Sequence, residues 1–166
     1  MNPSVEIRKA TSEDLPAITD IYNVEVMSST ATLDTEPRGD EEARAWFEEH
    51  TGRYPILVAT RGGVVVGWAS ISQWSDRKGY DGTAEISYYV KSGHRGEGIG
   101  RRLVDATITN ARKQKLHTLV ARIGGESEVS LRLCRSAGFT DVGVMKEVGH
   151  KFGRLLDVHI LQKMLE

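Results

Sequence analysis

Two hydrophobic periods alternate along the chain. Apolar residues recur every three or four positions within 15–26, 40–50, 99–115 and 127–136, which predicts four helices. Alternating or continuous apolar positions within 5–9, 55–60, 64–74, 83–90, 118–123, 142–145 and 155–165 predict seven strands. The resulting order is strand, two helices, three strands, helix, strand, helix, two strands. It predicts one α/β domain over residues 1–166, with a mixed, mostly antiparallel central sheet flanked by helices.

Charge and composition exclude several classes of partner. The chain has 22 basic and 23 acidic residues, so no overall field attracts nucleic acid or a membrane surface, and we expect neither as a partner. Apolar runs are far shorter than the roughly 20 residues of a membrane span, and the N-terminus does not resemble a signal peptide. One cysteine, Cys134, allows no internal disulfide and suits a reducing compartment. A cytoplasmic protein is therefore expected.

A glycine-rich loop follows the predicted strand 83–90 and precedes a long predicted helix. Glycines at 96, 98 and 100 let the backbone approach an anion closely, and the first amides of the helix lack partners of their own. With the helix dipole behind them, they form an anion site to which Arg95, Arg101 and Arg102 add charge. The spacing fits neither a Rossmann fingerprint nor a P-loop. A flexible glycine turn is the simpler alternative.

Two motifs carry a resemblance to a known family. The pattern Arg95-x-x-Gly98-x-Gly100 between a strand and a helix resembles the acetyl-CoA motif of the GNAT N-acetyltransferases. Residues 130–139, Ser-Leu-Arg-Leu-Cys-Arg-Ser-Ala-Gly-Phe, resemble the next block of that superfamily, and the element order matches throughout. The resemblance implies a GNAT fold whose central strands splay apart, with acetyl-CoA as cosubstrate.

Further patterns narrow the resemblance to the phosphinothricin and methionine sulfoximine acetyltransferases. They lie in residues 35–37, 54–55, 74–85 and 149–158. These enzymes acetylate the α-amino group of phosphinothricin, methionine sulfoximine, methionine sulfone or related amino acids. The resemblance therefore implies direct acetyl transfer to such an amine. Two alternatives stay open at this point, namely a protein or peptide N-acetyltransferase and a non-catalytic acetyl-CoA sensor.

The family resemblance also implies where the cofactor lies. Pantetheine would occupy the gap beside the strand ending at Val90, pairing with backbone as an added strand does. The implied cofactor-binding residues are Tyr88, Tyr89, Val90, Arg95, Gly96, Glu97, Gly98, Ile99, Gly100, Arg101 and Ser127. Ser127 stands where relatives often have an asparagine.

Glu85 is the candidate general base. It shares one face of its strand with Ser87 and Tyr89, and a carboxylate inside such a strand is costly unless that face is wet or functional. A solvent-facing glutamate paired with an arginine is the alternative. The match of residues 83–85 to the family favours a base that acts directly or through water.

Cys134 is the candidate for the group beside the CoA sulfur. Related enzymes usually place a tyrosine or histidine there as a general acid or positioning group, whereas this chain has a thiol. A small buried hydrophobic side chain is the alternative. A covalent acetyl-cysteine is not expected, because no histidine is adjacent to activate the thiol.

The loop before the strand 83–90 supplies the candidates for substrate binding. Arg77 offers a planar fork suited to a carboxylate, phosphinate or sulfone, and Trp74 and Tyr80 could wall an apolar part of the substrate. The full substrate set is Trp74, Arg77, Tyr80, Glu85, Ile86 and Ser87. The five histidines show no paired metal-ligand spacing, so no metal is expected. We expect a homodimer in which the C-terminal tail and residues 28–37 reach the second subunit.

Overall fold

Seven strands form one sheet in the computed structural model, which describes residues 3–125 and 127–166. The strand order is β1-β2-β3-β4-β5-β7-β6. All neighbours are antiparallel except β4 and β5, which are parallel. The strands are β1 (Val5–Lys9), β2 (Ile56–Arg61), β3 (Val64–Gln73), β4 (Thr83–Val90), β5 (Thr118–Gly124), β6 (Thr140–Lys151) and β7 (Arg154–Met164). The predicted mixed, mostly antiparallel sheet is confirmed.

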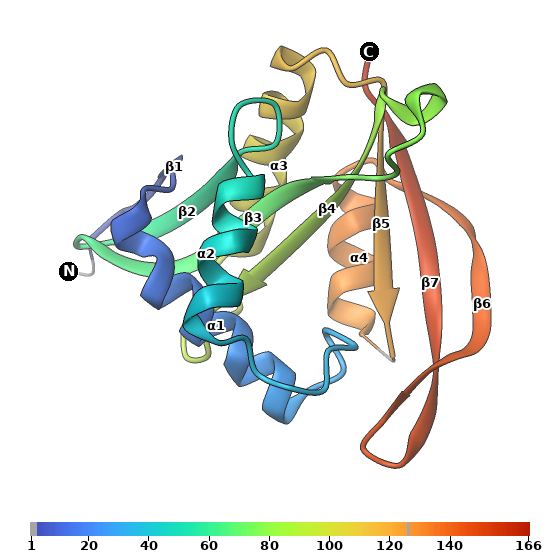
Figure 1. Ribbon diagram of the computed structural model, residues 1–166, viewed down its shortest axis with the longest axis horizontal. Coiled ribbons are helices and arrows are strands. Elements are labelled where there is room, and N and C mark those ends of the chain that lie inside the picture. The colour runs from blue at the N-terminus through green and yellow to red at the C-terminus, as the bar shows by residue number, and fades with distance from the viewer. Residues whose placement is uncertain (1–2, 126) are drawn as a thin grey trace.

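Four helices cover the two faces of this sheet (Figure 1). They are α1 (Leu15–Ser28), α2 (Asp40–Glu49), α3 (Ile99–Lys113) and α4 (Glu128–Ser136). On one face, Trp68 of β3 packs against Ile18 and Tyr22 of α1. On the other face, Val104 of α3 and Leu131 of α4 belong to one buried cluster with strand residues. The sheet is thus the middle of three layers, and β5, β7 and β6 extend beyond α1 and α2 at the right of Figure 1.

Strands β4 and β5 separate soon after they meet. Their pairing runs only from Thr83 opposite Thr118 to Glu85 opposite Val120. Beyond that point β4 continues along β3 as far as Val90, while β5 continues along β7 as far as Gly124. Five residues of β4 therefore have no strand neighbour on the β5 side, which is the expected splay.

The strand before the last is longer than its hydrophobic pattern predicts. Instead of strands at 142–145 and 155–165 joined by a loop, β6 and β7 form a long hairpin that turns at Phe152 and Gly153, with φ angles of 53° and 71°. The register shifts between Met145 and Gly149, and Glu147 there has a φ of 54°. This bulge interrupts the alternation of apolar and polar positions. The sequence pattern therefore ended the first strand too early.

Candidate active site

The glycine loop holds its glycines in the conformation that an anion site needs. Gly96 and Gly98 have φ angles of 78° and 81°, in the left-handed region, and Gly98 is the N-cap of α3. The N–H of Arg102 donates to Gly98 O at 3.1 Å, so the amides of the first turn before it have no helical acceptor. Gly100 packs tightly on α4, since a Cβ there would lie 3.0 Å from Leu133 Cδ1. The loop thus presents backbone N–H groups at the end of β4.

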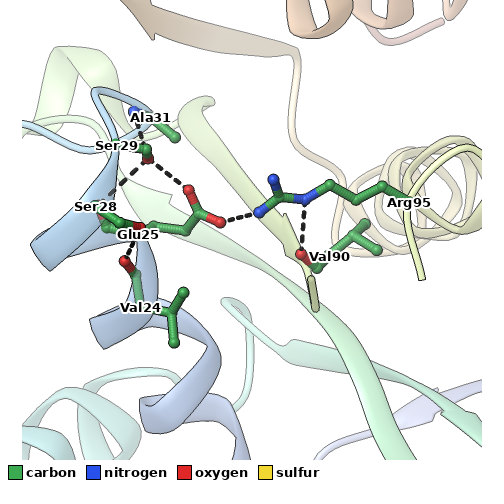
Figure 2. A network of polar contacts seen from close by, with 7 residues as sticks. All are labelled: Val24, Glu25, Ser28, Ser29, Ala31, Val90 and Arg95. Atoms are coloured by element: carbon green, nitrogen blue, oxygen red, sulfur yellow. Dashed lines mark hydrogen bonds and ion pairs between the residues drawn. The ribbon is translucent and has the colours of Figure 1, made fainter. Parts of the chain in front are cut away.

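An ion pair ties this loop to the first helix. In Figure 2 the Arg95 guanidinium reaches across from the loop to Glu25 of α1 and also lies near the carbonyl of Val90. Glu25 is buried, at 5% exposure, and its other oxygen accepts from Ser29 Oγ. Sequence reasoning missed Glu25, because a glutamate within an amphipathic helix normally faces water.

Three other charged side chains near the loop, Arg101, Arg102 and Glu97, are also bonded to other parts of the protein. Arg101 binds Asp105 at 3.0 Å and Ser136 Oγ at 3.0 Å, which directs it toward α4. Arg102 donates to Val5 O at 2.7 Å, and Glu97 accepts from Arg61 at 2.8 Å. Charge at the loop is therefore held in ion pairs and backbone bonds.

The separated part of β4 carries the tyrosines that were expected to bind the cofactor. Tyr88 faces α4, whereas Tyr89 packs edge-on against Tyr22 of α1 at 5.3 Å between ring centroids. Burial raises the pKa of both Tyr88 and Tyr89 above the ordinary value for tyrosine. Tyr88 and Tyr89 thus pack on the two faces of β4. The edge of β4 along the gap presents its backbone.

Glu85 lies where β4 and β5 part, and Arg122 of β5 binds it. Arg122 Nη2 donates to Glu85 Oε1 at 2.7 Å, and Nε donates to Oε2. This bond is the main reason that the pKa of Arg122 is raised. The guanidinium carbon of Arg122 also lies 5.8 Å from the centre of the Trp74 ring. The structure thus joins Glu85 and Trp74 through an arginine that the sequence patterns did not single out.

Cys134 lies in the core of α4 next to the Tyr88 hydroxyl. The residue is 1% exposed, and its sulfur is 3.5 Å from Tyr88 Oη. The hydroxyl also donates to Ser130 O at 3.4 Å. Burial raises the pKa of the Cys134 thiol. The family resemblance predicts a tyrosine or histidine at position 134 of α4. In this chain the hydroxyl group next to that position belongs to Tyr88 of β4.

The remaining predicted residues take different positions. Ser127 is the N-cap of α4, and its Oγ accepts from Ser130 N at 3.4 Å. The Ile86 side chain is buried in the core on the opposite face from Glu85, while Ser87 shares the face of Glu85. Arg77 and Tyr80 are exposed on the loop before β4. Trp74 and Glu85 are brought together, and Ile86 can contribute only its backbone.

The loop between α1 and α2 packs against the β6–β7 hairpin. Leu33 packs on the β6–β7 hairpin so closely that a Cβ at Gly149 would lie 2.8 Å from Leu33 Cδ1. Lys151, buried at 3% exposure, donates to Thr32 O at 2.8 Å. The loop joins α1 to the hairpin and bounds the region beyond Arg122.

The residues 3–125 and 127–166 contain no cluster of three or more metal-binding side chains. In the same part of the chain, no helix has both the length and the apolar character to cross a bilayer.

Comparison with known proteins decides the family. The model for the acetyltransferase (GNAT) family matches residues 18–139. This chain belongs to the GNAT acetyltransferase family. The match spans α1, the separated strands and the glycine loop, so this GNAT acetyltransferase carries the family's fold over most of its length.

Three relatives are similar over nearly the whole chain. The L-methionine sulfoximine/L-methionine sulfone acetyltransferase of Pseudomonas aeruginosa is 42% identical, covering 98% of this chain and 96% of its own. The L-amino acid N-acyltransferase MnaT of Escherichia coli is 39% identical, covering 98% and 95%. A crystal structure of a GNAT superfamily phosphinothricin acetyltransferase from Sinorhizobium meliloti in complex with acetyl-CoA has a TM-score of 0.94 and 34% identity, covering 97% of this chain and 88% of its own.

Proposed function

We propose that this GNAT acetyltransferase transfers an acetyl group from acetyl-CoA directly to the α-amino group of a small amino acid or amino acid analogue. The observation that carries the proposal is the position of Glu85, whose carboxylate lies at the end of the gap between β4 and β5. The names of the relatives support the acceptor class, which includes methionine sulfoximine, methionine sulfone and phosphinothricin.

Acetyl-CoA fits the gap and the loop together. The unpaired edge of β4 over residues 86–90 can bond the pantetheine amides as a neighbouring strand would. The first amides of α3, with the helix dipole behind them, suit the pyrophosphate at the end of the same strand. In this arrangement the thioester would lie beside Glu85 and Ser87.

Glu85 is the proposed base. Glu85 takes a proton from the acceptor ammonium, directly or through water, which leaves a nitrogen lone pair to attack the thioester carbonyl. The C–N bond forms as the C–S bond breaks, the electron pair leaves with the CoA sulfur, and the second proton lost by the nitrogen balances the charge of that thiolate. Arg122 occupies both carboxylate oxygens, so an acceptor ammonium must share Glu85 with it. The side chain is only 17% exposed, which limits competition from bulk water.

The Tyr88 and Cys134 pair is proposed to receive the departing sulfur. Burial raises the pKa of both groups, so both are protonated at neutral pH and either can donate a hydrogen bond to the developing thiolate. Tyr88 reaches this place from the strand that lines the gap, and Cys134 from α4.

A screen of free CoA release tests the proposed function. It would compare methionine sulfone, methionine sulfoximine, phosphinothricin, other free amino acids and peptides as acceptors. Acetylation of free amino acids supports the proposal. Acetylation of peptides alone, or of no amine while acetyl-CoA still binds, would overturn it.

A homodimer and a cytoplasmic location complete the proposal. The outer strand β6 exposes Val142, Val144, Met145 and Val148, and an unpaired edge strand with exposed apolar side chains favours association with a second copy. The mass in solution at micromolar concentration tests this.

The free thiol of Cys134 supports a reducing compartment.

A further inference from the structure

Arg122 lies beside the proposed acceptor site, and the proposed reaction gives it no role of its own. It lies on β5 two positions beyond Val120, the last residue of that strand paired with β4. Its side chain is 51% exposed, although it is bonded to Glu85. Because half of the side chain is open to solvent, a ligand can reach it beside the point where β4 and β5 separate.

The ion pair with Glu85 uses only one edge of the guanidinium. Nε and one N–H of Nη2 donate to the two oxygens of Glu85. A guanidinium has five N–H donors, so Nη1 and the outer N–H of Nη2 form a second edge. Over the described ranges 3–125 and 127–166, no protein atom accepts a hydrogen bond from Nη1 of Arg122. This second edge suits a carboxylate, which accepts two parallel N–H bonds.

The site therefore holds one negative and one positive group side by side where the strands part. A free α-amino acid carries an ammonium and a carboxylate on the same carbon, which is the complementary arrangement. We infer that the second edge of Arg122 binds the α-carboxylate of the acceptor while Glu85 receives its ammonium, so the acceptors are free α-amino acids. The inference rests on the proposed function and makes its substrate class specific.

Arg77 is less well placed for the α-carboxylate. It lies on the exposed loop before β4, whereas Arg122 is already in contact with Glu85 and lies above the Trp74 ring. Arg122 binds the carboxylate beside the amine, and Arg77 is left for a polar group at the end of the acceptor side chain, such as a sulfone or a phosphinate.

This assignment disfavours amines that have no adjacent carboxylate. At a peptide N-terminus, the α-amine is next to a neutral amide, which would leave the second edge of Arg122 without an anion. A charge-assisted contact of this kind is worth about 1.5–3 kcal/mol, which corresponds to roughly 10- to 150-fold in affinity.

The test compares L-methionine sulfone with its α-carboxamide, which keeps the amine and the side chain but removes the negative charge. For the wild type we expect kcat/KM to be about 10- to 150-fold higher for the acid. In Arg122→Lys, the ammonium can still pair with Glu85 but has no second edge, so most of this ratio should disappear through a higher KM for the acid. The KM for acetyl-CoA should not change. Arg135→Lys is the matched control, because Arg135 makes a similar fork to Asp141 on the exposed surface.

Arg77→Ala gives the opposite pattern. It should lower kcat/KM for methionine sulfone relative to kcat/KM for alanine, whose side chain has no polar end. The preference for the acid over the amide should stay unchanged. Thermal unfolding confirms that each variant is folded, and Arg122→Gln replaces Arg122→Lys if the lysine variant is not.

Two results would overturn the inference while the proposed function stands. One is a wild type that acetylates the acid and the amide equally well, and the other is a folded Arg122 variant that keeps the wild-type ratio. If no free amino acid is acetylated, the proposed function itself fails, and the same screen shows this before any variant is made.

Discussion

Glu25 and Arg95 are 70 positions apart in the sequence and form an ion pair that joins α1 to the glycine loop (Figure 2). The Glu25 side chain is 7% exposed, whereas the Arg95 side chain is 56% exposed. The pair is therefore desolvated on one side only. Ser29, at the end of α1, binds the same carboxylate and links the start of the α1–α2 loop to the contact.

The Glu25–Arg95 pair should contribute measurably to stability. In a double-mutant cycle of Glu25→Gln and Arg95→Gln, we expect a coupling free energy of about 1 kcal/mol, at the upper end of values for exposed pairs because one partner is buried. Urea unfolding of the two single variants and the double variant measures it. Additive effects would show that the contact carries no net stability.

Gly98 should be required for acetyl-CoA binding because it combines a left-handed φ of 81° with a position at the start of α3. Gly98→Asp should raise the dissociation constant of acetyl-CoA by about tenfold or more, since it adds negative charge where the phosphates are expected. Gly98→Asn is the control, because asparagine tolerates this φ and is similar in size but neutral. Calorimetric titration of folded variants gives both values, and equal affinities for the two would exclude a charge effect.

Glu85→Gln should lower turnover by about 100-fold, the usual contribution of a positioned base, while acetyl-CoA binding persists. The deficit should shrink as the pH rises, because more of the acceptor amine is then already deprotonated. Steady-state rates between pH 7 and about 9.5 provide the check. Near wild-type turnover at pH 7 would leave Glu85 as a partner of Arg122 with no role as a base.

Tyr88→Phe should lower kcat by about tenfold or more, because it removes a hydrogen bond to the developing thiolate. Cys134→Ser keeps a donor of similar size and should change kcat much less. Single-turnover rates at saturating acetyl-CoA separate this effect from binding. If the serine variant loses more activity than the phenylalanine variant, the thiol is the important member of the pair.

His50 should make stability depend on pH. Burial lowers its pKa below 6.5, and its ring bonds Trp46 O at 2.6 Å and Ser72 Oγ at 2.9 Å. The unfolded chain binds the proton more readily than the folded one, so the free energy of unfolding is full above pH 6.5 and falls as the pH drops below it. The slope from this group cannot exceed about 1.4 kcal/mol per pH unit. Denaturation curves of the wild type and His50→Gln, recorded at several pH values between 5 and 7, give the free energy of unfolding as a function of pH. This dependence should be steeper for the wild type, and equal slopes would mean that His50 is not responsible.

Local periodicity predicted the elements, and the family motifs predicted the splay of β4 and β5. The strand bounds of β4 and the inward residues of α3, such as Leu103 and Ile108, follow from periods that tertiary contacts do not override. The hairpin was predicted less well, because the bulge at Glu147 breaks the period on which strand prediction depends.

The candidate site was also predicted only in part. The glycine loop and Glu85 lie in short continuous motifs, so the sequence identified them. Arg122 and Glu25 acquire their meaning from partners 37 and 70 positions away, and one sequence contains no signal for such pairs. The Tyr88 and Cys134 contact was missed for the same reason, although each residue had been singled out separately.

The short pairing of β4 with β5 leaves the middle of the sheet with few backbone hydrogen bonds. In the part of the chain that the structure describes, three residue pairs join β4 to β5, and the Glu85–Arg122 bridge crosses directly beside them. Side chains hold the two halves together instead, because one buried cluster contains Ile86 of β4, Leu119 of β5 and Leu161 of β7. A cofactor bonded along β4 would supply the backbone partner that β5 does not, and an acceptor bound to Glu85 and Arg122 would link the two halves of the sheet.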